Sequence, residues 1–175
     1  GLTETLLIDI ERGTLDAAIV ARPHLMPADL RFRELAREPM QLIAADQETE
    51  DDPIALLNAR PFIRFNRNAV LGTLIDNWLR SKKIRVSETM ELDSPEAIAS
   101  MVHANLGVSI VPDLAVKPLD RMTVKRLSLG PNAPMRSIGL VYHKDQLKTH
   151  AIDEVFNVLA AVIDDAKQKA AGVET

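Results

Sequence analysis

Hydrophobic positions along this chain change repeatedly between helical and strand-like spacing. In the first segment, Leu6, Leu7 and Ile10 recur at helical intervals, and Gly13 is typical of the end of a helix. Further helices are expected at 53–59, 66–83 and 94–104, and at the C-terminus where Ile152, Val155, Phe156, Leu159, Val162 and Ile163 form one apolar stripe. Strands are expected at 15–21, 30–36, 39–45, 61–65, 84–92, 108–112, 122–129 and 136–144.

Strands that alternate with helices predict an α/β fold in which most strands run parallel. The acidic segment 46–52 separates two such cycles and reads as a solvated turn, so more than one sheet is expected. The chain has 175 residues, of which 46% are hydrophobic and 26% charged. These values suit one domain, or two small lobes that share a chain.

Charge and cysteine content exclude several function classes. The net charge of −4 argues against nucleic-acid binding by this chain alone, because neutralising phosphates needs a positive face. The absence of cysteine removes disulfides, thiolate catalysis and cysteine-based zinc sites from these residues. No apolar run reaches the ~18 residues of a membrane span. We therefore expect no membrane partner and a cytoplasmic location.

The sequence offers no positive sign of catalysis. The four histidines are scattered without ligand spacing, and they are His24, His103, His143 and His150. Neither a nucleophile elbow nor a glycine-rich phosphate loop occurs. We expect no catalytic residues, no metal and no cofactor, and the chain is not expected to be an enzyme.

Polar residues follow several predicted strands, where ligands bind in open α/β sheets. Arg22 follows the strand 15–21, and the segment 66–68 follows the strand 61–65 and precedes a helix. Ser94 occupies an N-cap position, with Pro95 at the first helical position. Free N–H groups at a helix start can hold an anion, and the arginines point the same way. The alternative is that these residues only cap their helices.

Several segments resemble one known family. The segment "LDSPEAIASMVHANLGVSIVP" is similar to the helix–strand signature of the effector-binding domain of LysR-type transcriptional regulators. "LLIDIERGTLDAAIVARP", "FRELAREPMQLIAA" and "RSIGLVYHKD" resemble other parts of that domain, in the family's order. The resemblance covers roughly residues 4 to 165.

This resemblance implies a two-lobed, type II periplasmic-binding-protein-like α/β fold with two crossover strands. Lobe I would be residues 1–43 and 136–175, lobe II would be 44–135, and the crossovers would lie near Ala44–Ala45 and Arg136–Ser137. A small organic effector, often an anion, would bind between the lobes. The implied effector-binding residues are Arg22, Pro23, Asn66, Arg67, Asn68, Ser94 and Pro112.

The family also has elements without a counterpart here. These are the N-terminal winged helix-turn-helix, its linker helix, and the first strand, helix and second strand of lobe I. The resemblance implies that the full protein is a homodimer or tetramer. It also implies that DNA is contacted only through the missing N-terminal domain. Two alternatives stay open: a solute-binding protein of a transporter, which shares the fold, and an α/β enzyme, for which no motif speaks.

Overall fold

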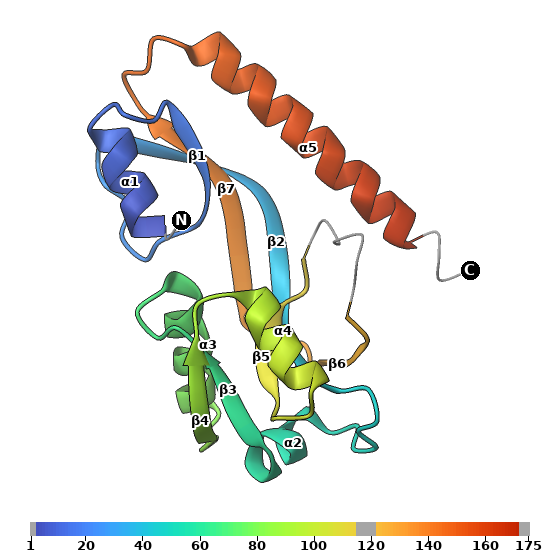
Figure 1. The fold of residues 1–175 in the computed structure, drawn as a ribbon. Helices are drawn as coiled ribbons and strands as arrows, with labels where there is room; N and C mark the ends of the chain where they lie inside the picture. Colours follow the sequence, from blue (N-terminus) through green and yellow to red (C-terminus); the bar gives the residue numbers. More distant parts are fainter. Residues whose placement is uncertain (1–2, 115–121, 172–175) are drawn as a thin grey trace. The chain divides into compact units, whose positions relative to one another are not determined.

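The computed structural model describes residues 3–114 and 122–171, which form two compact units (Figure 1). The chain passes from unit 1 to unit 2 at Glu38–Pro39 and returns at Arg136–Ser137. Unit 1 holds both ends of the chain, and unit 2 holds the middle. The boundaries that the family resemblance implies for two ligand-binding lobes, 1–43 with 136–175 and 44–135, remain a prediction.

Unit 1 contains helix α1 (Thr3–Glu11), strand β1 (Ala17–Ala21), the first half of β2 (Leu30–Ala45), β7 (Met135–His143) and helix α5 (Thr149–Ala171). Strand β1 pairs antiparallel with β7, and β7 lies next to β2 in the sheet. The small hydrophobic core of unit 1 consists of Leu7, Ile10, Val20, Leu30 and Val141.

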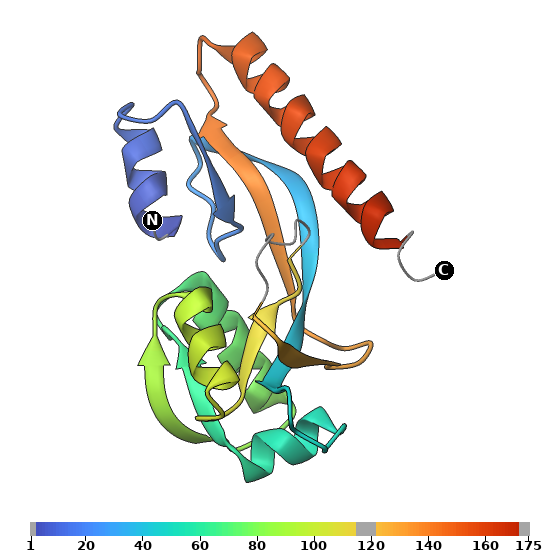
Figure 2. The ribbon, with the colours of Figure 1, turned by 45° about the vertical axis from the view of Figure 1, so that its right-hand side comes forward.

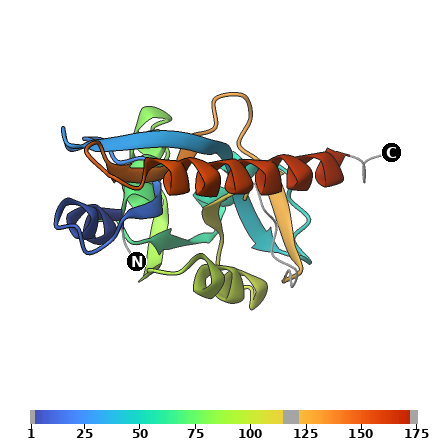
Figure 3. The same cartoon turned by 90° about the horizontal axis from the view of Figure 1, so that it is seen from above.

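Helix α5 is attached to β2 through one arginine. The Arg33 guanidinium forms an ion pair with Asp153 and lies 3.8 Å from the centroid of the Phe156 ring. Figure 3 shows α5 running alongside this part of β2. A cation over an aromatic face adds to the packing, so one side chain orients the helix by both charge and contact.

Two expectations about the strands were wrong. The predicted strands 30–36 and 39–45 are a single 16-residue strand, β2. Pro39 has no N–H to give to the ladder, but its carbonyl accepts a hydrogen bond from the Asp113 N–H at 2.8 Å and the strand continues through it. The strands are also not mostly parallel, because β1–β7, β2–β5 and β2–β6 are all antiparallel pairs.

Unit 2 contains α2 (Pro53–Ala59), β3 (Pro61–Phe65), α3 (Val70–Ser81), β4 (Ser87–Leu92), α4 (Pro95–His103), β5 (Ser109–Pro112) and β6 (Val124–Ser128). Strand β3 pairs in parallel with β4 on one side, and Phe62 forms a parallel bridge with Val108 on the other. Figure 2 shows β3 and β4 side by side, with α4 packed near them. The expected helix 66–83 begins four residues later, at Val70.

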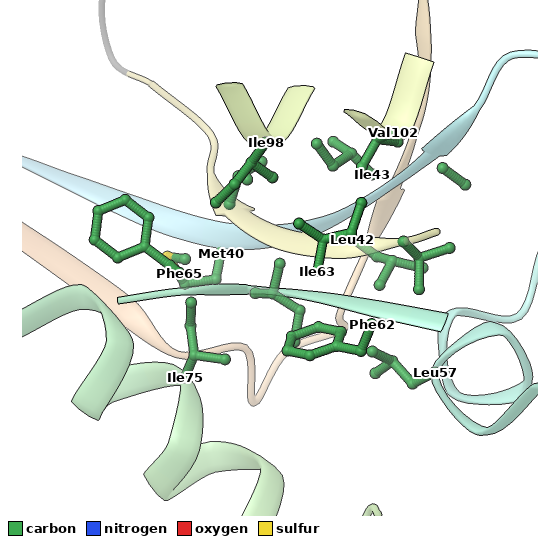
Figure 4. Close-up of a cluster of buried hydrophobic side chains, with 14 of the residues drawn as sticks. Met40, Leu42, Ile43, Leu57, Phe62, Ile63, Phe65, Ile75, Ile98 and Val102 are labelled. Atoms are coloured by element: carbon green, nitrogen blue, oxygen red, sulfur yellow. The ribbon is translucent and has the colours of Figure 1, made fainter. Parts of the chain in front are cut away.

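The larger hydrophobic core lies in unit 2 and is centred on β3. Phe62 and Ile63 are completely buried, and Figure 4 shows Ile98 of α4 and Ile75 of α3 on opposite sides of this strand. Burial of each such side chain stabilises the fold by about 1.5–3 kcal/mol. Strand β3 therefore has a rigid setting, and the loop that follows it starts from a defined position.

Across the residues described here, no helix combines the length and the apolarity needed to cross a membrane.

Candidate functional site

The loops that follow β3 and β4 are joined by hydrogen bonds at the carboxyl ends of these strands. The Asn66 N–H donates to the Leu92 carbonyl oxygen at 2.9 Å, and the Asn66 side-chain amide donates to Asp93 Oδ1 at 2.6 Å. Since Asp93 precedes Ser94, four predicted site residues, Asn66, Arg67, Asn68 and Ser94, gather on this side of unit 2. We call this region, residues 66–69 with 93–96, the carboxyl edge.

Pro112 belongs to the same end of the unit. Strand β5 runs parallel to β3, because the Ile63 N–H donates to the Val108 carbonyl at 2.9 Å and the buried Ser109 hydroxyl donates to the Ile63 carbonyl at 2.7 Å. Pro112 ends β5, is buried, and lies opposite Met40 of β2. It can therefore supply an apolar surface but no hydrogen-bond donor.

Ser94 is the N-cap of α4, as predicted. Its hydroxyl oxygen accepts from the Ala97 N–H at 3.2 Å, and the hydroxyl donates to Glu96 Oε2 at 2.6 Å. The bond from Ser94 lowers the pKa of the Glu96 carboxyl. Ser94 therefore caps its helix, which was the alternative to a ligand contact, and its hydroxyl already has a carboxylate partner.

The asparagines organise the loop before α3. The Asn66 side-chain oxygen accepts from the Asn68 N–H at 2.9 Å, which closes a local turn. The helix that follows has Ala69 at its N-cap position, without a side-chain cap bond. Hence Asn66 connects the β4 loop with the start of α3 rather than capping the helix itself.

Arg67 is paired with two carboxylates of β4. Its Nε lies 3.0 Å from Glu91 Oε2 and its Nη2 lies 3.0 Å from Glu88 Oε2. The Arg67 backbone N–H also donates to Glu91 Oε1 at 3.1 Å, and this bond together with the guanidinium lowers the pKa of the Glu91 carboxyl. One carboxylate is therefore held by both the backbone and the side chain of Arg67.

A β-bulge places both carboxylates within reach of Arg67. Glu88 and Glu91 are three positions apart, and in a regular strand they would point to opposite faces. The register of β4 against β3 shifts by one residue between Phe62 and Ile63, so Thr89 is an extra residue in the ladder. The extra residue resets the alternation, and both side chains meet the same guanidinium.

Sequence reasoning missed a buried arginine beneath this network. Arg64 of β3 forms ion pairs with Asp76 of α3 and Glu88 of β4, and its side chain is only 7% exposed. Its guanidinium carbon lies 5.8 Å from the centroid of the Phe62 ring. The available signal was a single charged residue inside the otherwise apolar segment "PFIRF".

The two remaining predicted residues, Arg22 and Pro23, lie in unit 1 and form a separate group. They follow β1, and the Arg22 N–H donates to the Ser137 carbonyl at 2.8 Å. The Arg22 guanidinium carbon lies 5.1 Å from the centroid of the Phe32 ring, and Arg22 as a residue is exposed. Arg22 therefore keeps an accessible positive charge.

Unit 1 also has an apolar groove between β1 and α5. Its lining residues are Leu15, Asp16, Ala17, Ala18, Ile19, Leu140, Lys148, Ala151, Ile152, Val155 and Leu159. Lys148 and Asp16 form an ion pair at 2.7 Å within it.

Among the described residues, no group of three histidine, aspartate or glutamate side chains is arranged to hold a metal ion. At the carboxyl edge, the side chains of Asn66, Arg67 and Ser94 each donate to a carboxylate of the chain.

The fold is that of the two-unit α/β domains with a periplasmic-binding-protein-like architecture. The chain belongs to the LysR substrate binding domain family, whose family model matches residues 1–164. Among curated proteins, it is 23% identical to the HTH-type transcriptional regulator SoxR of an Arthrobacter strain, across 96% of this chain and 57% of that protein. It is 30% identical to the uncharacterised HTH-type transcriptional regulator YraN of Bacillus subtilis, across 65% of this chain and 38% of that protein.

Solved structures agree on the fold. The effector binding domain of QuiR in complex with shikimate superposes with a TM-score of 0.76 at 22% identity, covering 96% of this chain and 79% of that one. The regulatory domain of Synechocystis CcmR in complex with 2-PG gives a TM-score of 0.75 at 20% identity, covering 91% and 79%. The chain spans about three fifths of the length of one of these curated relatives and about two fifths of the other.

Proposed function

We propose that this chain is the ligand-sensing part of a LysR-type transcriptional regulator. A small organic effector binds it and shifts an equilibrium between two conformations, which a helix-turn-helix domain elsewhere in the full protein passes to DNA. The observation that carries this proposal is the family match over residues 1–164. An effector can act in this way only through different affinities for the two states.

The carboxyl edge of unit 2 is the proposed effector contact in that unit. Asn66, Arg67, Asn68 and Ser94 would supply polar groups, and Pro112 an apolar surface, while Arg22 and Pro23 would contribute from unit 1. The regulatory domains of QuiR and CcmR were solved with small molecules bound, which supports a small-molecule ligand for this fold. The accessible positive charge of Arg22 favours an anionic effector, and so does Arg67, provided that the anion takes the place of a carboxylate paired with it.

The full protein is proposed to be a cytoplasmic homodimer or tetramer without enzymatic activity. The matched curated relatives are named as HTH-type transcriptional regulators, which supports this class over a solute-binding protein of a transporter or an enzyme. A cysteine-based sensing chemistry has no residue to use among these 175 positions. Non-covalent binding is therefore the proposed mode of sensing.

Two linked measurements test the proposal. Thermal unfolding of the full-length protein is followed across a library of small carboxylates, phosphate esters and neutral metabolites, because a ligand of the native state raises the melting temperature. Each hit is then tested for its effect on binding to DNA from the protein's own promoter region at constant salt, since salt alone changes such affinities. Hits that alter DNA binding support the proposal. A library that stabilises nothing, or hits without effect on DNA binding, would contradict it.

A further inference from the structure

Three polar side chains of the carboxyl edge, those of Asn66, Arg67 and Ser94, are already held by carboxylates of the chain itself. Arg67 is paired with Glu88 and Glu91, each at 3.0 Å. The Asn66 amide donates to Asp93, and the Ser94 hydroxyl donates to Glu96. At these three side chains, an incoming anion would therefore meet donors that already have anionic partners.

Glu91 holds Arg67 in the way that a small carboxylate ligand would. One of its oxygens accepts from the Arg67 backbone N–H at 3.1 Å, and the other accepts from the Arg67 Nε at 3.0 Å. Both oxygens of one carboxylate are thus engaged by one residue, one by its backbone N–H and the other by its guanidinium, and both hydrogen bonds are charge-assisted. Glu88 differs, because its other oxygen is committed to the buried Arg64.

Glu91 is also free to leave this position. The side chains of Arg67 and Glu91 are 52% and 37% exposed, so water can replace either partner. Ion pairs with this exposure contribute little to stability, and breaking one does not threaten the fold. The buried Arg64 with Asp76 and Glu88 keeps β3, β4 and α3 together if Glu91 moves away.

We propose that Glu91 is an internal competitor that occupies the anion position formed by the backbone and side chain of Arg67, so that an anionic effector binds there only by displacing it. Glu91 is then a residue that determines specificity. Weakly held anions are excluded, and a ligand is selected that offers a carboxylate or phosphate together with further contacts. This inference rests on the proposed effector-binding function and adds a named site and ligand class to it.

The test compares anion affinities of variants in the full-length protein. Succinate is the probe, sodium chloride at equal ionic strength is the reference, and the apparent affinity comes from the dependence of the melting temperature on probe concentration. Glu91→Gln removes the competing charge and is expected to tighten succinate binding about fivefold, the scale of an exposed ion pair. Arg67→Ala in the Glu91→Gln background is expected to abolish the gain.

Asp46→Asn is the control, because it removes one negative charge from an exposed position of unit 2 outside the carboxyl edge. If Glu91 is the competitor, only Glu91→Gln tightens binding. Equal tightening in both variants would mean that net charge alone acts, and no tightening, or no succinate binding in any variant, would mean that Glu91 does not compete; each result overturns the inference. The proposed function is tested separately by the compound library and the DNA-binding measurement. Its outcome does not depend on whether succinate binds to any of these variants.

Discussion

Arg64 of strand β3 and Asp76 of helix α3 form an ion pair that is almost closed to solvent, with side chains only 7% and 16% exposed. The same guanidinium also pairs with Glu88 of β4. Three neighbouring elements of unit 2 are therefore joined through one buried cation. A buried charge without a partner is strongly destabilising. Removing one member of the group Arg64, Asp76 and Glu88 should therefore lower the stability of unit 2.

Replacing Arg64 with Met is expected to lower the free energy of unfolding by about 3 kcal/mol, because two carboxylates lose their cation. The measurement is denaturant unfolding followed by the fluorescence of Trp78, which is the chain's single tryptophan and lies in α3 of the same unit. Arg80→Ala is the control, since Arg80 is 77% exposed and 3.9 Å from Asp76. An Arg64→Met chain as stable as the wild type would show that the ion pairs do not hold the unit together.

Acid should weaken unit 2 through Glu88. The bond with Arg64 lowers the pKa of the Glu88 carboxyl below its ordinary value of 4.5. A folded-state pKa below the unfolded one contributes stability that is present above pH 4.5 and is lost as the pH falls through the lowered value. Glu88→Gln is therefore expected to flatten the loss of stability between about pH 5 and pH 3, measured by urea unfolding at each pH. An unchanged acid profile in this variant would contradict the assignment.

Gly72 lies in α3 directly under the loop that carries Arg67. A Cβ at this position would lie 2.7 Å from the carbonyl carbon of Asn66 and 2.8 Å from the Arg67 Cα, and closer still to the Asn66 carbonyl oxygen. The backbone of the carboxyl edge therefore rests against this glycine, and a side chain would push the loop away.

Gly72→Ala is a strong test, because helix propensity and steric contact predict changes of opposite sign in the free energy of unfolding. Helix propensity alone favours Ala over Gly by about 1 kcal/mol in a helix interior. We expect the opposite, a destabilisation of about 2 kcal/mol from the forced backbone shift, measured by the same fluorescence-detected unfolding. Effector or anion response at Arg67 should weaken in parallel. A stabilised variant would mean that the loop yields easily.

Periodicity in the sequence predicted most of the helices and strands, but not their pairing. The segment "PFIRF" was correctly expected to be a strand, yet its partners in β4 are residues 26 or more positions away along the chain. The bulge at Thr89, which brings Glu88 and Glu91 to one guanidinium, leaves no mark in the hydrophobic pattern. Likewise, the sequence shows that Pro39 lacks an N–H, but it does not show that the Pro39 carbonyl accepts from the Asp113 N–H within a continuous strand.

The candidate site was predictable to a similar degree. Strand ends and an N-cap motif placed Asn66 and Ser94 at loops that the structure joins through Asp93. The sequence could not show that Arg67, chosen for its charge, already has carboxylate partners. Such pairing depends on side chains from another strand, which the pattern within one segment does not report.

Ser94 allows capping and effector contact to be separated experimentally. Ser94→Ala removes the oxygen that accepts from the Ala97 N–H, and the loss of an N-cap is expected to lower the free energy of unfolding by about 1 kcal/mol. Ser94→Asn keeps an N-cap acceptor and should restore that stability, because Asn caps helices as well as Ser. Ser100→Ala on the same helix is the control for a lost hydroxyl, since Ser100 donates only within α4 and to Met122.

The two Ser94 variants lead to different outcomes for sensing. If the hydroxyl contacts the effector, Ser94→Asn has normal stability but a weakened melting-temperature response to any effector found in the library. If Ser94 only caps α4, the same variant restores both stability and response. We expect the first result, because the Ser94 hydroxyl lies at the same edge as Asn66 and its present partner, Glu96, is two residues away on the same helix and can turn aside without unfolding it.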